Sequence, residues 1–347
     1  MSNPTIENGV VGVEGGTAVG SERTVTCVHG FVLAGPSTIR CDANAQWTTS
    51  SVRCEPSESI FWAATMGHEQ VVRVLVDKRP ELIEERDRTN TTVLATAASY
   101  GQSGIVEFLL SKPMINLEAK DKDGRTALAL AASKGHLRVV KMLVKRGADL
   151  HSRSYIDDYE DLPIHFASLA GHSDVVEYLV QTDRGQLTVR NRDGDTPLHR
   201  AVVGGHVNTV RTLLDLGSNI EARNSDGWTP LCHAAAEGNL DIVRMLYDRG
   251  ANVYARSNAD DDEDMPIHLA AYFGHLQVVS FLIDRKHELL FAKNRENESP
   301  INRAAVGGHT SVVEYLLSRG VGIETTGFRG RTPLHEGKSF IILISRN

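Results

Sequence analysis

A short sequence pattern recurs every 33 to 36 residues, and this repeat constrains the fold more than any other feature of the chain. Its equivalent positions follow at steps of 36, 34, 33, 36, 34 and 33 residues, and they are Thr126, Leu162, Thr196, Thr229, Met265, Ser299 and Thr332. The same step taken upstream reaches Thr92 and Glu58, which gives eight full repeats and a broken ninth. A period of this length indicates stacked repeats, each too small to bury its own helices, so stability must come from interfaces between neighbours.

Each repeat has the residues of two short helices. Thr229 can cap the first helix because its hydroxyl accepts from backbone N–H groups, and Pro230 fits the first turn, where no N–H is needed. Ala234 lets a neighbouring helix approach closely, and Gly238 suits the left-handed end of the helix. A second helix follows at once, with apolar residues at helical spacing such as Ile242, Val243 and Leu246. The sequence therefore predicts a mainly α fold of helix pairs.

Three stretches have the same order of residues: Thr196-Pro197-Leu198-His199, Thr229-Pro230-Leu231 and Thr332-Pro333-Leu334-His335. With the glycines that follow, they resemble the ankyrin repeat family, and the resemblance runs from about residue 58 to residue 336. It implies an α-solenoid with projecting hairpin fingers that binds another protein on its concave groove and fingertips. We therefore expect a non-catalytic interaction scaffold. The alternative is a regulatory or targeting fragment of a larger multidomain protein, either secreted or membrane-bound.

Three of the four cysteines, Cys27, Cys41 and Cys54, lie within the first 54 residues. Such crowding is typical of an oxidised small domain or of a metal site. The intervals of 14 and 13 residues differ from the close pairs of a zinc ribbon, which favours a disulfide over a metal.

The same segment resembles most of a sushi (complement control) module, a small β-rich domain. The resemblance rests on Cys27 with Gly30-Phe31-Val32-Leu33, Ile39-Arg40-Cys41, Trp47 and Cys54. The family pairs its first cysteine with its third and its second with its fourth, and the first is missing here. The resemblance thus implies a Cys27–Cys54 disulfide, a thiol at Cys41 and a core position for Trp47. We expect either upstream sequence lost from the gene model or a decayed module over residues 1–56.

The net charge and the hydropathy of the chain argue against nucleic acid as a partner and against a membrane span. A net charge of −7 gives no general attraction for nucleic acid, and no apolar stretch approaches the length of a membrane span. The first thirty residues lack the pattern of a signal peptide, so we expect a cytoplasmic chain. The sushi-like segment supports the alternative, a secreted or extracellular chain whose N-terminus is truncated. The final residues, 337–347, are expected to form an irregular apolar tail.

The sequence offers no catalytic, cofactor-binding or metal-binding residues. Ten of the fourteen histidines fall on two fixed repeat positions, which indicates a structural role. Gly337-Lys338-Ser339 ends like a phosphate-binding loop, but Thr332 stands where that motif needs a glycine. Cys232 beside His233 is better explained as a small buried residue than as a nucleophile. We therefore expect no enzymatic activity and no cofactor.

Two hairpin fingers are longer and strongly acidic. They comprise Asp157, Asp158, Glu160 and Asp161 in one finger, and Asp260, Asp261, Asp262, Glu263 and Asp264 in the other. We hypothesise that they contact a basic segment of a partner. The alternatives are solvated loop charge and, less favoured because the glycine of an EF-hand is absent, calcium binding.

Aromatic residues form the second candidate contact. The ankyrin resemblance places Tyr100, Tyr272 and Phe273 on the groove, and Trp228 lies at a fingertip. Aromatic side chains commonly anchor a bound chain. The alternative for each of the four is packing between repeats.

Overall fold

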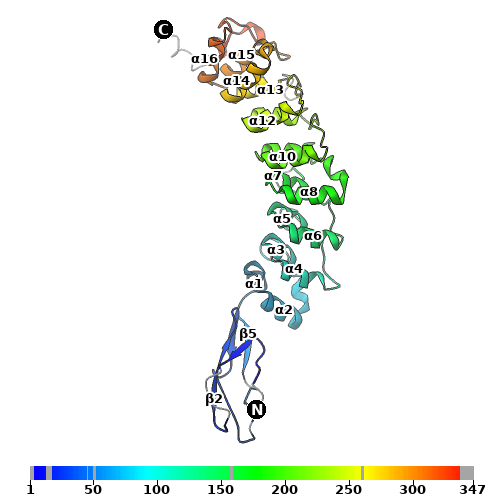
Figure 1. Cartoon of the computed structure of the whole chain (residues 1–347), viewed down its shortest axis with the longest axis vertical. Coiled ribbons are helices and arrows are strands. Elements are labelled where there is room, and N and C mark those ends of the chain that lie inside the picture. The colour runs from blue at the N-terminus through cyan, green and yellow to red at the C-terminus, as the bar shows by residue number, and fades with distance from the viewer. Residues whose placement is uncertain are drawn as a thin grey trace. The chain divides into compact units, whose positions relative to one another are not determined.

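Short strands form the N-terminal part of the chain, and pairs of short helices follow from Ile60 onward (Figure 1). The computed structural model describes residues 4–12, 18–44, 46–49, 52–156, 159–258 and 262–336. The predicted apolar tail lies outside these ranges. The chain divides into an N-terminal unit, Met1–Ser152, and a C-terminal unit, Arg153–Asn347. Within the described ranges, no helix combines the length and the apolar character that crossing a bilayer requires.

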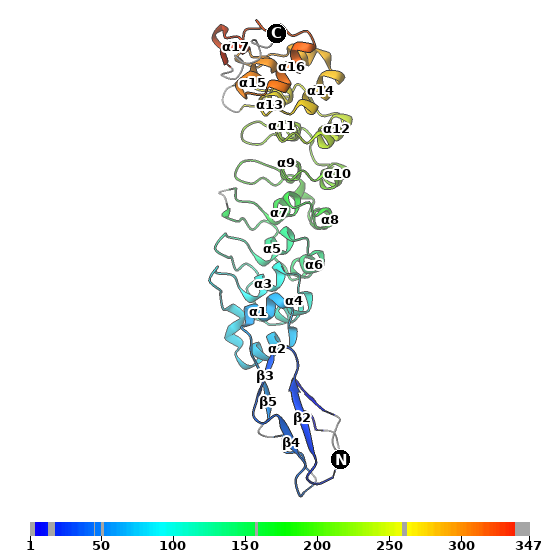
Figure 2. The ribbon, with the colours of Figure 1, turned by 90° about the vertical axis from the view of Figure 1, so that its left-hand side faces the viewer.

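The N-terminal unit begins with a small β region. Its described strands are β1 (Gly9–Val11), β2 (Glu22–Cys27), β3 (Phe31–Ala34), β4 (Thr38–Arg40) and β5 (Arg53–Pro56). One antiparallel sheet has the order β1-β2-β4. Strand β3 pairs with β5, and both are labelled in Figure 2. Side chains alternate along β2, so Val25 points inward and packs with Ile39 and Val52. Trp47 packs against this cluster, which confirms its predicted core position.

A disulfide closes the β region. Cys27 at the end of β2 is bonded to Cys54 in β5, with their Cα atoms 5.7 Å apart, so the implied pairing is confirmed. Cys41 is a buried thiol whose Sγ lies 3.9 Å from the carbonyl oxygen of Asp42.

Reducing this disulfide should loosen the β region and leave the helical repeats folded. A bridge between residues 27 positions apart contributes roughly 3–4 kcal/mol in the chain-entropy model. We expect a Cys54→Ser variant to be cleaved by protease within the strands at doses that leave wild-type protein intact, with fragments identified by mass spectrometry. Helical circular dichroism should stay unchanged. Equal protease resistance of the variant and the wild type would contradict this expectation.

Helix pairs make up the rest of the N-terminal unit. They are α1 (Ile60–Met66) and α2 (Glu69–Lys78), then the 3-10 helix η1 (Pro80–Glu84), α3 (Val93–Ser99) and α4 (Ser103–Leu110), and α5 (Ala127–Ser133) and α6 (Leu137–Lys145). The Thr92 hydroxyl accepts from the N–H of Ala95 at 3.2 Å, as the capping prediction requires. In the first repeat the cap is Ser59, which accepts from Trp62, and Glu58 lies one residue before it. The upstream step of the repeat was therefore wrong by one residue at this position.

The C-terminal unit continues the same pairing. Its helices are α7 (Pro163–Leu169), α8 (Ser173–Thr182), η3 (Arg184–Leu187), α9 (Pro197–Val203), α10 (Val207–Asp215), α11 (Pro230–Ala236), α12 (Leu240–Asp248), α13 (Pro266–Tyr272), α14 (Leu276–Arg285), η5 (His287–Phe291), α15 (Pro300–Val306), α16 (Thr310–Ser318), η6 (Phe328–Gly330) and α17 (Pro333–Glu336). Within this unit the first helices of successive repeats lie side by side, as do the second helices. Gly205 follows Gly204, the C-cap of α9, and has a φ of 72°, a left-handed conformation that favours glycine.

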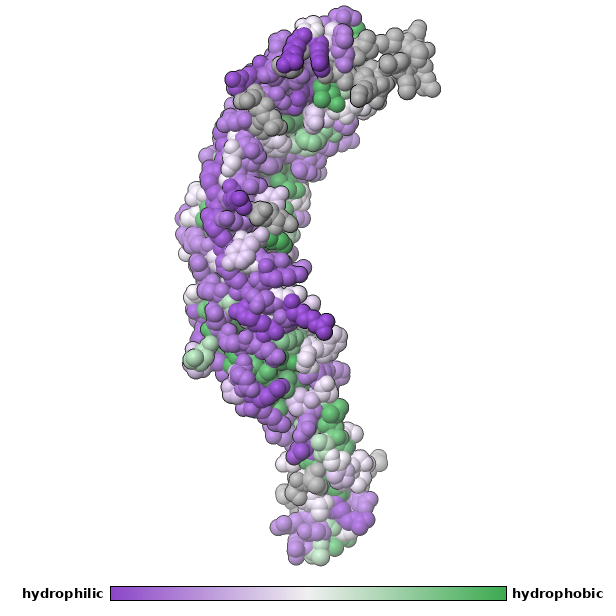
Figure 3. All heavy atoms as spheres, turned by 180° about the vertical axis from the view of Figure 1, so that it is seen from behind, coloured by the Kyte–Doolittle hydropathy of each residue, from purple (hydrophilic) through white to green (hydrophobic). Residues whose placement is uncertain are grey.

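Apolar side chains are buried between the helices of successive repeats. Ile164, Leu179 and Leu198 are fully buried, as neighbour-dependent repeats require. On the face shown in Figure 3, hydrophilic residues cover most of the surface, and apolar residues are visible between them. The mainly helical architecture with a small β region is therefore as predicted.

Candidate functional site

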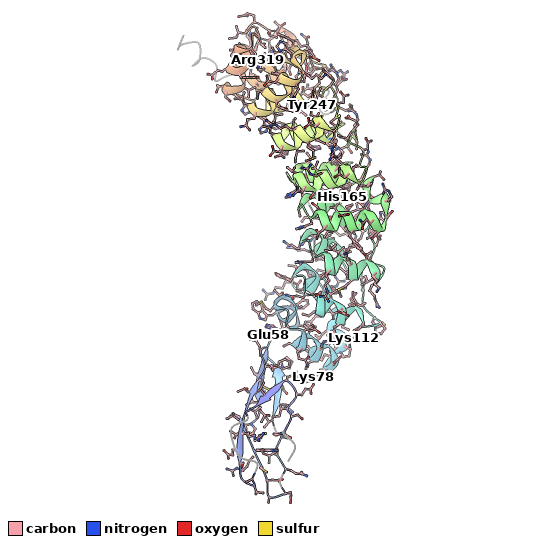
Figure 4. The ribbon with its side chains drawn as sticks, in the orientation of Figure 1. Glu58, Lys78, Lys112, His165, Tyr247 and Arg319 are labelled. Atoms are coloured by element: carbon pink, nitrogen blue, oxygen red, sulfur yellow. A yellow bond between two sulfur atoms is a disulfide. The ribbon has the colours of Figure 1, made fainter. Side chains whose placement is uncertain are left out.

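Buried histidines connect the first helices of the C-terminal unit to the next hairpin. The N–H of Leu162 donates to His165 Nδ1 at 3.2 Å, and His165 Nε2 donates to the carbonyl oxygen of Asp195 at 3.0 Å. His199 and His268 reach carbonyl oxygens of the next hairpin in the same way, at 3.1 Å each. His165 lies among the helices of this unit in Figure 4. The predicted structural role of these three histidines is confirmed.

Burial keeps the imidazoles neutral. Burial lowers the pKa of His165 and of His268 to about 3, and that of His199 to about 4. Because Nδ1 accepts a backbone N–H, a proton added there would place two donors face to face. Such rings are poor candidates for acid–base catalysis near neutral pH.

Repeat eight makes the same connection with an amide. The Oδ1 of Asn302 accepts from the N–H of Ser299 at 3.1 Å, and its Nδ2 donates to the carbonyl oxygen of Thr325 at 3.2 Å. Asparagine thus replaces histidine at this position without a titrating group.

A second repeat position with a structural role lies immediately before the second helix of each repeat. At five of these positions the side chain contacts the preceding repeat. His136, His206 and His275 place Nε2 at 3.0, 3.0 and 2.7 Å from carbonyl oxygens of the repeat before. Gln102 and Asn239 make the same contact through their amide nitrogens. At these five positions the residue therefore links its repeat to the preceding one.

The base of each acidic finger is buried and engaged by the array itself. Arg200 Nη2 lies 2.8 Å from Asp161 Oδ2, and Asn191 donates to the other carboxylate oxygen at 2.9 Å. Arg303 Nη2 lies 2.6 Å from Asp264 Oδ2. The carboxylate side chains of Asp161 and Asp264 are only 1% and 3% exposed. The sequence-based assignment of these two residues to a partner-binding surface is therefore corrected, because they bind arginines of the following repeat.

The other described acidic residues of the fingers also face arginines of this chain. Glu160 lies 3.6 Å from Arg153, Glu263 lies 3.9 Å from Arg256, and Asp262 lies 3.3 Å from Arg303. Asp157, Asp158, Asp260 and Asp261 lie outside the described residues. The hypothesis that the two fingers contact a basic partner remains a prediction.

The two fingers are copies of one arrangement, displaced by three repeats. Asp161 and Asp264 stand 103 residues apart, and four other members of the arrangement have counterparts at the same displacement. Asp262 is an exception, because Tyr159 stands at the corresponding position. The matching pairs are Arg153 and Arg256, Glu160 and Glu263, Asn191 and Asn294, and Arg200 and Arg303. Glu160 and Glu263 also share a left-handed backbone, with φ of 54° and 51°.

Aromatic side chains line a pocket of about 250 Å³ beside the second finger. Tyr272 and Phe273 at the end of α13 form part of its wall, and the rings of the two residues meet edge to face with centroids 5.1 Å apart. The guanidinium of Arg303 lies 4.7 Å from the centre of the Tyr272 ring and holds it in place. Phe273 remains 45% exposed.

Trp228 forms another part of the same wall and also packs between repeats. Its side chain contacts the buried cluster of Cys232, Ala236 and Leu269, and its ring centre lies 4.9 Å from that of His233. The packing alternative therefore applies to Trp228 more than to Phe273.

A pocket of about 410 Å³ occupies the equivalent face of the N-terminal unit. Tyr100, predicted from the sequence, lines it and is 56% exposed. Trp62 lines it as well and is 54% exposed, although sequence reasoning did not select it. The available signal was its position, since Trp62 stands at the third residue of α1, where α7 and α9 have the framework histidines.

Among the described residues, one group of three offers ligands for a metal ion. One ligand atom each of His29, Glu58 and His68 lies within 4.8 Å of the others. Sequence patterns do not indicate this group, because its members are separated by 29 and 10 positions and match no metal-binding motif.

The stacked helix pairs with hairpins between them define a repeat protein built on paired helices. The family model for ankyrin repeats (3 copies) matches residues 34–121, 60–154, 113–191, 164–257 and 255–327, and the model for the sushi repeat (SCR repeat) matches residues 2–54. The chain belongs to the ankyrin repeat family and carries an N-terminal sushi repeat.

Curated relatives match over short segments. Alpha-latrocrustotoxin-Lt1a of Latrodectus tredecimguttatus is 32% identical over 80 residues, which is 23% of this chain and 5% of the toxin. Protein lev-9 of Caenorhabditis elegans is 39% identical over 70 residues, 18% of this chain and 11% of that protein. Alpha-latrotoxin-Lh1a of Latrodectus hasselti is 34% identical over 58 residues, 17% of this chain and 4% of the toxin. The matches thus span a small part of each relative.

A solved structure matches over a larger share. It is a chain from the complex of a predatory endopeptidase of Bdellovibrio bacteriovorus with an immunity protein. The match has a TM-score of 0.51 and 29% identity, and it covers 56% of this chain and 98% of that one.

Proposed function

We propose that this chain is a non-catalytic scaffold that binds another protein through the face formed by its first helices and hairpins. Ankyrin repeats are typically protein-binding and generally non-catalytic. The matched solved structure comes from a complex between two proteins, which supports the same class of function.

The observation that carries the proposal is the exposure of large aromatic side chains at pockets on this face. Trp62, Tyr100 and Phe273 are each about half exposed although they are large and apolar. Aromatic residues are enriched where proteins meet, because they bury much area with few rotatable bonds. Their placement beside polar hairpins gives an apolar anchor with a polar rim, which is the usual anatomy of a binding surface.

A second candidate function is a binding region within a larger multidomain protein. The observation that favours it is the length of the curated relatives, of which the matched segments cover only 5%, 11% and 4%. In that case the array would direct the rest of the protein to a partner by the same aromatic face.

Removing the aromatic anchors should weaken binding at least tenfold. Partners would first be captured on the immobilised full chain from an extract of the native tissue, and the affinity of a purified partner would then be measured by titration calorimetry. We expect Tyr100→Ala or Phe273→Ala to raise the dissociation constant at least about tenfold, since an anchoring aromatic side chain contributes roughly 2 kcal/mol or more to binding.

Phe291→Ala is the matched control for this experiment. Phe291 is an exposed aromatic residue, 55% exposed in η5, that lines neither pocket. Its removal should leave the affinity within about twofold, because isolated exposed contacts contribute little. If the Trp62, Tyr100 and Phe273 variants all bind as the wild type does, the proposed face is not the binding surface.

A further inference from the structure

His29, Glu58 and His68 converge where the β region meets the first repeat. His29 lies in the turn between β2 and β3, Glu58 lies between β5 and α1, and His68 directly precedes α2. His68 Nδ1 is 2.7 Å from Glu58 Oε2, and the ring centres of His29 and His68 are 4.5 Å apart. Figure 4 shows Glu58 at the point where the strands give way to the helices. Three segments of the chain thus bring one potential ligand each.

His68 departs from the role that its repeat position has elsewhere. In five later repeats this position reaches a carbonyl oxygen of the preceding repeat, as His136 does with Ser99 at 3.0 Å. His68 belongs to the first repeat, so its ring is directed toward the β region and contacts Glu58 instead. Glu58 departs from its expected role as well, because Ser59 caps α1. Neither side chain is needed for the hydrogen bonds that build a repeat.

The turn that carries His29 is held close to α2 by the backbone of the next residue. Gly30 accepts from the N–H of Ser57 at 3.0 Å and has a φ of 85°. A Cβ atom on Gly30 would lie 2.6 Å from Val71 Cγ2 and 3.6 Å from His68 Nδ1. This close approach fixes the distance between His29 and the first repeat, so the three ligands are positioned by the fold.

We propose that His29, Glu58 and His68 bind a zinc ion that joins the β region to the first ankyrin repeat. Two imidazole nitrogens and one carboxylate oxygen form a ligand set that Zn²⁺ prefers, with a water molecule as the fourth ligand. At Zn–N and Zn–O lengths of about 2.0–2.1 Å, tetrahedral ligand atoms lie roughly 3.3 Å apart. The ligand atoms already lie within 4.8 Å of one another, and the exposed side chain of His29 has room to close the remaining gap.

Binding at His68 replaces the present hydrogen bond to Glu58. His68 Nδ1 is within bonding distance of the Glu58 carboxylate, which only accepts when ionised, so Nδ1 carries the proton. Zinc bound at Nδ1 moves that proton to Nε2 and leaves the imidazole neutral. The side chains of His68 and Glu58 are only 19% and 14% exposed, so the ion would be partly shielded from solvent. Burial of this kind strengthens the attraction between the cation and the carboxylate.

Titration calorimetry of the full chain, after removal of any histidine tag and of bound metal by a chelator, tests the proposal. We expect the wild type to bind one equivalent of Zn²⁺ with an affinity that His29→Ala, Glu58→Gln and His68→Gln each weaken at least about tenfold. Glutamine is the residue of repeat two at the position of His68, so His68→Gln should fold. His136→Gln makes the same change in repeat three and should bind as the wild type does.

Two further readouts separate a zinc site from a simple histidine–glutamate contact. Zinc should raise the unfolding midpoint of the wild type and of His136→Gln but not that of His68→Gln, because a ligand of the folded state stabilises it. Cobalt(II) should give the visible absorption of a tetrahedral site in the wild type and in His136→Gln, but not in the His29→Ala, Glu58→Gln or His68→Gln variants. No zinc equivalent bound by the wild type, or equal zinc affinity of the three ligand variants and the wild type, would overturn the proposal.

Discussion

Acidification from about pH 7 to about pH 5 should destabilise the C-terminal unit, and replacing its three buried histidines with asparagine should remove most of that loss. Burial holds the pKa of His165 and of His268 near 3, against an ordinary value of 6.5. Between these two pKa values the histidines are protonated in the unfolded chain but stay neutral in the folded chain. The resulting stability is fully present above about pH 6.5 and is lost as the pH falls toward the folded pKa.

The expected size of this effect is large. Each of these two histidines can cost the folded state on the order of 5 kcal/mol over the full range, since one pKa unit corresponds to about 1.4 kcal/mol. Nearby arginines add to the lowering of the pKa, Arg200 at His165 and Arg256 with Arg303 at His268. The contacts with the backbone oxygens of Asp195 and Ala292, and the charge of Asp195, oppose it. Partial unfolding of the array well above pH 3 is therefore expected.

Urea unfolding at a series of pH values, followed by circular dichroism, measures this loss. The control is a triple variant with His165→Asn, His199→Asn and His268→Asn. Asn302 shows that an amide can make both framework hydrogen bonds in this array. We expect the pH dependence of the triple variant to be much flatter than that of the wild type. Parallel curves for the two proteins would show that the histidines are not the cause.

Replacing Asp161 with alanine should destabilise the C-terminal unit by about 3–5 kcal/mol. The change leaves the guanidinium of Arg200, whose side chain is 8% exposed, without its 2.8 Å carboxylate partner. Burial raises the pKa of Asp161 even though Arg200 opposes this, so desolvation offsets much of the attraction between the two charges. Replacing both residues together, as in Asp161→Leu with Arg200→Met, should therefore cost much less than the single change.

A surface pair in the same unit supplies the control. Asp215 and Arg249 are 2.9 Å apart, but their side chains are 59% and 37% exposed. Asp215→Ala should cost about 1 kcal/mol or less, because exposed ion pairs contribute little. Urea midpoints of the four proteins give the comparison. A loss for Asp161→Ala no larger than that for Asp215→Ala would contradict the structural role of the buried pair.

The repeat pattern predicted the helices well because capping and burial are local. Thr92 and Thr229 cap their helices as expected, since a hydroxyl and the N–H it accepts lie three residues apart. The same pattern misplaced the first cap, because Glu58 and Ser59 are equally consistent with a period that varies by up to three residues.

The candidate contacts were harder to predict because they depend on residues far apart in the chain. The acidic fingers were judged by their own charge, whereas Arg200, 39 residues after Asp161, decides that this carboxylate is buried. Tyr100 was found since it stands at a groove position of the family. Trp62 was missed because it occupies the position at which other repeats have a buried structural histidine.

The duplicated arrangement in the two fingers bears on how such a chain can change length. The residues that join one finger to the next repeat recur 103 positions later with the same partners, so Asp264 meets Arg303 as Asp161 meets Arg200. A gene segment encoding three repeats could therefore be inserted or deleted at this spacing, and each new junction would find its matching arginine, asparagine and aspartate. Insertion of three repeats at this spacing would preserve the pairing of Asp161 and Asp264 with arginine, whereas one repeat inserted between Asp161 and Arg200 would separate that pair.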